Sequence, residues 1–482
     1  MLPQVSLKDY DGLNGFGTSS MNDVNELTKA LSAGYQTSGQ TSGSALRVES
    51  LESSLKVVSF TNKHIKLWKK IPKSAAYSTV EEFNVLSSYG AGGAFGFTRE
   101  GEIPQSQDST YTRQTALVKF IGTTRSVTHP ATLVNPAHGD VIALENQNGI
   151  LWLLERTEDA LFHGNSALAF DGESEAFDGL DSLISTGNVI DLEGQPLQEA
   201  DIEEASNQII ESFGYPTDMF LGTRAMSDLV KTFYPRERIN LPAPSDGKVG
   251  LAVSSMATQA GNIDFNPNVF IKQAKSPPSA ATSANAPATP GTPTDAALTG
   301  TDANWAKLLG TPSGTTTFAY RVTACNRFGE SAASASTTAD VTPANVTAGA
   351  HVPLTVVNAA SIGANPPEFF IIYRSNALAS GATAPTAMSS YSEIARVRCT
   401  LQTAAGDGAT FNDVNLNLPF TETAYLGELT PSVLTFRQLA PLMRMDLAVL
   451  APAYRWMVLL YGTPILFAPA KWTRLINVGR IA

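Results

Sequence analysis

The sequence predicts an α+β protein that carries an inserted all-β module. Three observations point to this fold class. An apolar-striped run between Pro136 and Gly164 has helical spacing, two segments before it are rich in β-branched and aromatic residues, and short β segments follow a composition change near Lys275. At 482 residues the chain is longer than one ordinary core can serve, so we expect two or three structural units.

Composition and charge narrow the class of protein. Charged residues make up 16% of the chain, below the roughly 25% of an average domain, so much of the surface is expected to be buried against other chains. The 33 basic residues are outnumbered by 44 acidic ones, and the formal charge of -11 argues against sequence-specific nucleic-acid binding. An acidic wall suits a container for DNA because it would not grip phosphates, although ordinary solubility explains the same charge equally well.

Nothing in the sequence predicts secretion or a membrane span. The start, Met1 to Tyr10, lacks the basic-then-apolar order of a signal peptide, and apolar runs such as Trp456 to Tyr461 fall short of the roughly 18 residues that span a bilayer. Cys325 and Cys399 are too few for a disulfide scaffold or a four-cysteine zinc site. We expect reduced thiols in a cytoplasm, with a disulfide as the alternative.

The N-terminal part of the chain is polar and contains two short predicted helices. Val24, Leu27 and Leu31 define the first, with Ser20 as its cap, and the second follows Gly43. An ordinary flexible terminus is the alternative.

An arm and a two-stranded ribbon are predicted next. From Asn62 to Lys73 apolar residues alternate with lysines, which predicts an extended arm. Tyr77 to Tyr89 and Tyr111 to Thr128 are predicted strands, joined through the glycine-rich tip Gly90 to Gly96. Such a ribbon has too little core to be stable alone, so it must rest on another surface. A hairpin folded onto its own domain is the alternative.

A long helix is predicted from Ala137 to Phe162, on the order of 40 Å at about 1.5 Å per residue. Around Ile150 to Leu154 this helix is apolar on nearly all sides, so we expect it to be covered from more than one direction. Its apolar positions recur at intervals of three and seven, at Val141, Leu144, Leu151, Leu154 and Leu161.

A compact helix, strand, helix order follows. Phe177-Asp178-Gly179-Leu180 predicts a turn in which Gly179 takes a positive φ. A helix ending at Gly214, a short strand from Met219 to Gly222 and a helix capped by Thr223 come next. The predicted apolar faces are Ile202, Ala205, Ile209 and Phe213 in the first helix, and Met226, Leu229, Val230 and Phe233 in the second.

A β-sandwich is predicted as an insertion. Pro277 to Thr294 has the composition of a linker. Tyr320 to Ser331 resembles the Tyr-x-Val-x-Ala-x-Asn-x-x-Gly-x-Ser pattern of fibronectin type III and immunoglobulin-like modules, and Phe369 to Ser375 and Phe411 to Asp413 are further strands. An insertion needs its two ends close together, so the host domain should resume in short apolar strands from Leu434 to Ala482.

No catalytic, cofactor-binding or metal-binding residue is predicted, and the protein is not expected to be an enzyme. Phe95 stands where the third glycine of a dinucleotide loop belongs, and the acidic pairs Glu81-Glu82 and Glu203-Glu204 should point apart. The histidines have no ligand spacing, and we expect surface or capping roles for His64, His129, His138, His163 and His351.

The order of arm, ribbon, long helix and α+β region resembles the major capsid protein of tailed bacteriophages, with the Hong Kong ninety-seven fold. Phe162-His163-Gly164-Asn165 and the later Phe177-Asp178-Gly179-Leu180 resemble a pattern placed just after the spine helix of that family. The resemblance implies a scaffold-like segment or arm at 1–43, an N-arm at 44–75, an extended hairpin loop at 76–130, spine helix, peripheral and axial domains at 131–275, the inserted immunoglobulin-like sandwich at 276–428, and a return to the host domains at 429–482.

The same resemblance implies a function. We expect self-assembly into hexamers and pentamers of an icosahedral shell that encloses double-stranded DNA, in the virion, after assembly in the host cytoplasm. Portal, maturation protease and decoration proteins are the implied partners, with no membrane and no sequence-specific contact with DNA. An encapsulin-type cargo shell and a secreted carbohydrate-active protein are the alternatives, and the second would need a signal peptide and positioned carboxylates that are not seen.

Overall fold

The structure is a computed structural model, and it describes residues 61–90, 97–104, 106–134, 139–168, 176–237, 253–271, 275–309, 314–359, 365–399, 408–449 and 451–481. The chain divides into two compact units. The first, Met1–Val58 with Pro130–Val141, contains most of helix α4 (His129–Leu133) among its described residues. The second is Ser59–His129 with Ile142–Ala482. The helices predicted before Thr61 lie outside the described residues.

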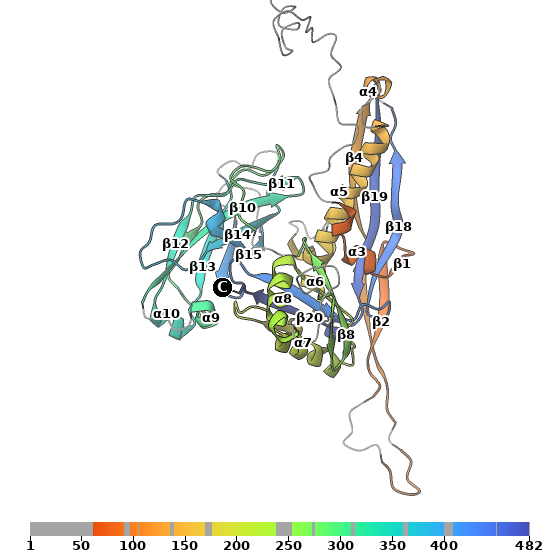
Figure 1. Cartoon of the computed structure of the whole chain (residues 1–482), viewed down its shortest axis with the longest axis vertical. Coiled ribbons are helices and arrows are strands. Elements are labelled where there is room, and N and C mark those ends of the chain that lie inside the picture. Colours follow the sequence, from red (N-terminus) through yellow and green to blue (C-terminus); the bar gives the residue numbers. More distant parts are fainter. Residues whose placement is uncertain are drawn as a thin grey trace, which may run out of the picture. The chain divides into compact units, whose positions relative to one another are not determined.

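The long helix and a four-stranded sheet form one body of the second unit (Figure 1). Helix α5 spans Val141–His163, which confirms the predicted long helix over its described length. Its backbone lies close to the sheet, since a Cβ built at Gly149 would stand 3.2 Å from Val458 and 3.3 Å from Arg125. The sheet order is β1 (Lys73–Ala75), β18 (Leu434–Asp446), β19 (Ala453–Leu466) and β4 (Lys119–Thr128).

Two faces of α5 differ in their burial. Leu153, Leu161 and Phe162 are buried, whereas Leu151 and Leu154 are only half-buried. One face is therefore fully buried, and every residue from Ile150 to Leu154 is at least half-buried, which agrees with the predicted cover from more than one direction. No helix in the described part of the chain is long and apolar enough to cross a membrane.

The prediction of an extended backbone for the arm is wrong. The segment forms the short helices η2 (Asn62–His64) and α3 (Leu67–Lys70) before β1 begins. Ile65, Leu67 and Ile71 are buried, so the apolar positions were assigned to the correct side. A helical turn is favoured because a carboxylate of α5 accepts hydrogen bonds from the backbone at the start of α3, as described below.

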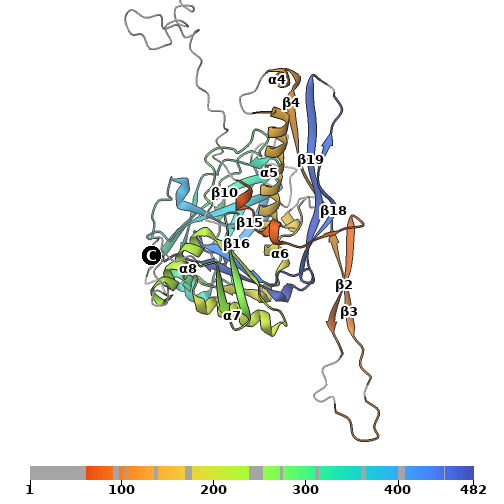
Figure 2. The ribbon, with the colours of Figure 1, turned by 45° about the vertical axis from the view of Figure 1, so that its right-hand side comes forward.

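The ribbon is real but shorter than predicted. β2 (Val80–Ser88) and β3 (Thr110–Leu117) pair only with each other in an antiparallel two-stranded sheet, within the described residues (Figure 2). The second predicted strand divides at Val118, which is buried and donates its N–H to Thr79 O at 2.9 Å. Beyond this point the chain turns into β4, which pairs with β19 instead of extending the ribbon.

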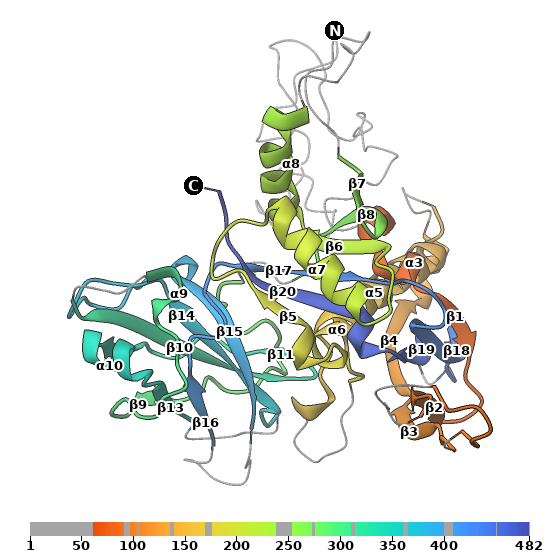
Figure 3. The ribbon, with the colours of Figure 1, turned by 90° about the horizontal axis from the view of Figure 1, so that it is seen from below.

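A six-stranded sheet carries the second core (Figure 3). Helices α7 (Glu199–Glu211) and α8 (Thr223–Glu237) pack on it, and every residue of β6 and β17 is buried. The predicted helix, strand, helix order is confirmed. The strands lie in the order β5 (Val189–Asp191), β20 (Trp472–Val478), β17 (Glu422–Gly427), β6 (Asp218–Gly222), β8 (Gly261–Asn268) and β7 (Ser255–Thr258).

Two predictions about single residues in this region are wrong. Gly179 has a φ of -90° and is the N-cap of α6 (Leu180–Leu183), so close packing rather than a positive φ requires glycine there. Phe213 is 89% exposed, because α7 ends before it and the chain reverses direction. The short helices nearby are η3 (Ser166–Leu168), η4 (Thr186–Asn188) and η6 (Pro469–Lys471).

The part of the chain that follows β8 and precedes β17 forms two further sheets. They face each other and share one hydrophobic core. One contains β10 (Thr316–Asn326), β11 (Gly329–Glu330), β12 (Thr337–Val341), β14 (Phe369–Ser375) and β15 (Tyr391–Arg398). The other contains β9 (Thr294–Asp295), β13 (Val352–Val357) and β16 (Gly408–Asp413). Short helices α9 (Ala306–Leu309) and α10 (Pro343–Ala348) connect them, and η5 (Met388–Ser390) lies between β14 and β15. We call residues 276–413 the two-sheet region.

The linker-like stretch belongs to this region rather than running free. Thr282 N donates to Glu330 O at 2.9 Å, and Gly291 N donates to Val357 O at 3.0 Å. Both cysteines are buried thiols, as predicted. Several short strands are predicted in the last part of the chain. The structure has longer strands there, β19 and β20, and β19 is not interrupted at Pro464 because its register with β18 continues through that residue.

Candidate functional site

Among the described residues, the ribbon is the clearest case of a surface that the rest of the chain leaves uncovered. Its register runs from Val80 opposite Leu117 to Leu86 opposite Tyr111. Almost all of its side chains are half-buried or exposed. A two-stranded ribbon of this kind is marginally stable in water unless it packs on something. Its large exposed apolar residues are Tyr77, Val80, Leu86, Tyr89, Tyr111 and Leu117.

Among the described residues, the root of the ribbon packs on its own chain through an aromatic contact. Phe83 meets Phe467 edge to face, with ring centroids 5.0 Å apart. Beside Phe83, Glu82 and Arg113 pair across the two strands. The remaining apolar surface, including Tyr111 at 68% exposure, is available to another molecule. Exposed apolar patches of this kind mark interaction surfaces in soluble proteins.

Glu158 anchors the arm to the long helix. Its carboxylate is fully buried and accepts hydrogen bonds from the backbone N–H groups of Lys66, Leu67 and Trp68 at 2.8 to 2.9 Å. Asn268 Nδ2 adds a fourth at 2.7 Å. These donors compensate the cost of burying the charge. The buried carboxylate therefore joins the arm, α5 and β8.

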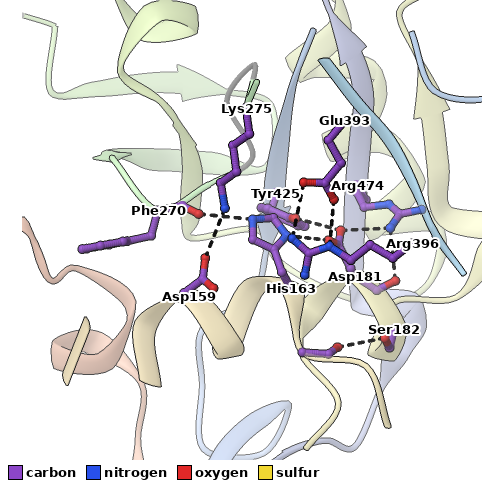
Figure 4. Close-up of polar contacts among 11 residues, drawn as sticks. Asp159, His163, Asp181, Ser182, Phe270, Lys275, Glu393, Arg396, Tyr425 and Arg474 are labelled. Carbon is purple, nitrogen blue, oxygen red and sulfur yellow. Dashed lines mark hydrogen bonds and ion pairs between the residues drawn. The ribbon is translucent and has the colours of Figure 1, made fainter. Parts of the chain in front are cut away.

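A polar junction lies where α5 ends (Figure 4). His163 Nδ1 is 2.7 Å from Asp181 Oδ2, and its Nε2 is 3.2 Å from Phe270 O. Asp181 Oδ1 also accepts hydrogen bonds from Tyr425 OH at 2.8 Å and from an Arg474 guanidinium nitrogen at 2.9 Å. The junction thereby connects α5, α6 and two strands of the six-stranded sheet.

The electrostatics of this junction follow from its burial and its partners. Burial favours the neutral form of Asp181, but the hydrogen bond and charge of His163, the charge of Arg474 and the Tyr425 hydroxyl outweigh it and hold the pKa of Asp181 well below its usual range. Burial and the neighbouring Asp181 raise the pKa of Tyr425 well above its ordinary value. The carboxylate is therefore a permanent structural anion, stabilised by donors on three sides.

The junction continues into the two-sheet region. Arg396 of β15 donates to Glu393 at 2.7 Å, and the Lys275 ammonium lies 3.8 Å from Asp159 of α5. Burial of the Arg396 side chain is compensated by Glu393, whose charge raises the pKa of Arg396. The Lys275 and Asp159 pair joins two segments, whereas Arg396 and Glu393 lie in the same strand, and these groups include no nucleophile paired with a base. Among the described residues, no group of three or more His, Cys, Asp or Glu side chains could hold a metal ion.

The structure tests several of the predictions made for single residues. Glu81 accepts the backbone N–H of Tyr77, while Glu82 pairs with Arg113, so this acidic pair points apart as predicted. His64 has the predicted capping role, through Thr61. His163 contradicts the surface or capping expectation, because only 8% of its side chain is exposed and it lies in the polar junction.

The sequence reasoning missed Glu158 and Asp181. A signal for Glu158 was present, because it lies four residues after Leu154 and three before Leu161, inside the apolar stripe of the helix. A carboxylate in such a stripe is buried and must be hydrogen-bonded. Asp181 had no comparable signal, since its partners are 18 to 293 positions away in the sequence.

The family model for the SU10 major capsid protein matches residues 57–308, just over half of the chain. The chain belongs to this family. The match extends from the arm through the ribbon, the long helix and the first four strands of the six-stranded sheet along the chain (β5, β6, β7 and β8) into the two-sheet region.

Relatives of the capsid protein match over nearly its whole length. The major capsid protein of Staphylococcus phage K is 27% identical over 471 residues, which covers 95% of this chain and 96% of the relative. That of Staphylococcus phage S25-3 is 28% identical over the same length and with the same coverage. A solved structure of Gordonia phage Cozz matches 92% of this chain and 96% of that chain, with 8% identity and a TM-score of 0.45.

Membership of this family makes the protein a phage major capsid protein, a structural component of the virion capsid. The cargo-shell and carbohydrate-active alternatives are not favoured.

Proposed function

We propose that this capsid protein assembles into hexamers and pentamers of an icosahedral shell around double-stranded DNA, with the ribbon as the tie between subunits. One observation carries the proposal. In the described residues, the ribbon exposes apolar side chains along both strands, and an aromatic contact at its root holds it to its own chain. Burial of that surface against a neighbouring copy would provide free energy at every repeated contact of a shell.

The proposal assigns parts of the chain to roles. We infer an N-terminal segment at 1–43, an N-arm at 44–75, an extended loop at 76–130, and peripheral and axial domains at 131–275 and 429–482, in the Hong Kong ninety-seven arrangement. Supporting this, the six-stranded sheet takes strands from both sides of the two-sheet region. Assembly would occur in the host cytoplasm, with portal, maturation protease and decoration proteins as partners.

We further propose that residues 276–428 form an immunoglobulin-like module on the outside of the shell. Support comes from two facing sheets with one shared core, entered after β8 and left before β17. Because both neighbouring strands lie in one sheet, the host core could close without the module.

The ribbon can be tested with a cross-strand pair. Leu86 and Tyr111 lie opposite each other, and replacing both with Ser removes apolar surface from the exposed part of the ribbon. We expect Leu86→Ser with Tyr111→Ser to abolish shells, because the tie between subunits is weakened at every repeat. Negative-stain electron microscopy and sedimentation velocity measure this directly.

The matched control is Phe328→Ser, which removes an exposed aromatic side chain from the two-sheet region. It should assemble like the parent chain. Shells formed by the double variant at the parent concentration would contradict the proposed role of the ribbon, provided that circular dichroism shows both chains to be folded.

A further inference from the structure

The end of helix α7 has an unusual residue in a position that normally requires glycine. Phe213 N donates to Ile210 O at 2.8 Å, and Gly214 N donates to Ile209 O at 2.9 Å. These two bonds form a Schellman motif, in which Phe213 is the residue just after the C-cap. Its φ is +60°, in the left-handed region.

A phenylalanine is disfavoured in this conformation. Left-handed backbone brings the Cβ of an L-residue close to the following carbonyl, so glycine or asparagine usually occupies the position. The other left-handed residues that are not glycine include Asn415 and Asn477, which tolerate it, and Phe420, which is half-buried. Phe213 has neither advantage.

Among the described residues, no burial of the Phe213 ring compensates for this strain. The Phe213 side chain is 89% exposed, and Tyr215, two residues later, is 68% exposed. The backbone between them is held firmly, because Tyr215 N donates to Glu428 and a Cβ on Gly214 would stand 2.8 Å from Ile209 and 3.0 Å from Lys471. Two aromatic rings are thus presented to solvent on a rigid turn.

The turn lies beside the root of the ribbon. Gly214 packs on Lys471, the last residue of η6, and η6 begins two residues after Phe467, which holds Phe83 of the ribbon. Two contacts, that of Gly214 with Lys471 and that of Phe467 with Phe83, therefore link this turn to the root of the ribbon. Rigid aromatic side chains of this kind supply much of the binding energy in protein interfaces.

We propose that Phe213 and Tyr215 form an aromatic contact with a second copy of this chain, beside the root of the ribbon. This proposal rests on the proposed shell assembly and adds a defined contact to it. The backbone strain at Phe213 is retained because the ring is needed between subunits, and it has no counterpart in the packing of the single chain.

Phe213→Gly distinguishes a role of Phe213 in assembly from a purely structural role, because it should raise stability and weaken assembly. Glycine relieves the left-handed strain, so the midpoint of thermal unfolding of the unassembled chain should rise by about 1–2 °C. Loss of the ring should raise the critical concentration for assembly about tenfold, by light scattering and sedimentation velocity. A purely structural role would move both in the same direction.

Phe213→Asn is the second variant, because asparagine also accepts the left-handed conformation without the added flexibility of glycine. It should repeat the loss of assembly, and Tyr215→Ser should show a similar loss without the gain in stability. Phe328→Ser again serves as the control. Unchanged critical concentrations for all three variants would overturn the contact, as would binding of a different molecule to this turn with assembly unaltered.

The result of the Phe213 experiment can be distinguished from the result of the ribbon experiment. If the Leu86→Ser and Tyr111→Ser chain loses assembly while Phe213→Gly does not, the ribbon remains a tie and the aromatic contact is refuted. If the ribbon variant assembles normally, the proposed function of the ribbon fails first, and the Phe213 result then stands on its own.

Discussion

At the scale of single residues, two carboxylates hold together parts of the chain that are distant in sequence. Glu158 accepts three backbone N–H groups from the arm, and Asp181 accepts donors from α5, β17 and β20. Removing a partner from such a buried charged network leaves donors unsatisfied, which costs more than an average hydrogen bond contributes.

Glu158→Gln should destabilise the chain by about 2–4 kcal/mol. One carboxylate oxygen is replaced by an NH₂ group, which would face backbone N–H donors instead of accepting their hydrogen bonds. Chemical denaturation of the unassembled chain measures this. Glu203→Gln, on the exposed side of α7, is the control and should change the free energy of unfolding by less than about 0.5 kcal/mol. Equal effects would mean that Glu158 does not anchor the arm.

Asp181→Asn should give a pH-dependent loss of stability. The pKa of Asp181 in the folded chain lies below the ordinary value of about 3.9, so its stabilisation is fully present above about pH 4 and is lost as the pH falls toward the folded pKa. We expect a loss of about 2–3 kcal/mol at pH 6 that shrinks toward pH 2.5. Denaturant titrations of both chains across this range provide the measurement. Asp264→Asn, at an exposed carboxylate, should show little of this dependence, and a pH-independent loss for Asp181→Asn would refute the charged role.

At the scale of elements, the junction between α5 and α6 depends on backbone contact. Gly179 N donates to Gly164 O at 2.8 Å. A Cβ built at Gly179 would stand 2.5 Å from Ala160 O, and one at Gly164 would stand 2.3 Å from Phe177 O. These glycines are needed for the close approach of two segments, which places His163 and Asp181 together.

Gly179→Ala should therefore destabilise the chain by about 1–3 kcal/mol or more, because the atoms it meets are backbone and cannot move aside. Differential scanning calorimetry would show a lower unfolding temperature. Gly187→Ala is a matched control, since the nearest atom to its Cβ would be Ser185 Oγ at 3.8 Å. The same shift in both variants would refute a requirement for close packing at Gly179.

At the scale of the whole molecule, the two-sheet region has its own core and its own buried ion pair. Arg374 donates to Asp413 at 2.6 Å and to Asn415 at 2.6 Å, and Tyr320 OH donates to Asp413 at 2.9 Å. Trp305 lies beside the Arg374 guanidinium. Most of these contacts lie inside the region, and Asn415 follows it by two residues, so this network does not involve the exposed loops.

Bulky labels on such loops should be tolerated. Asn376 and Thr383 are both exposed, so Asn376→Cys or Thr383→Cys coupled to a large maleimide should leave assembly within about twofold of the parent, if this side faces outward. Shell yield by electron microscopy is the readout. A label in the ribbon, at Tyr111→Cys, provides the contrast and should block assembly. Failure of the two loop-labelled chains to assemble would count against an outward position.

The sequence by itself determined the elements whose signal is local. Periodicity predicted α5 and α7, richness in β-branched and aromatic residues predicted the ribbon, and a short apolar run predicted β6. Side-chain patterns of this kind depend only on the repeat of a helix or strand, which the sequence contains.

Only the tertiary structure decided which surfaces and groups meet. The arm is helical because Glu158, about 90 positions away, accepts its backbone N–H groups, and the ribbon ends at Val118 because β19 competes for the next strand. Phe213 matched the apolar face of α7 but lies beyond its end, because the Schellman turn reverses the chain there. Hydrogen bonds between distant segments select among local conformations of similar energy, and no short stretch of sequence contains that choice.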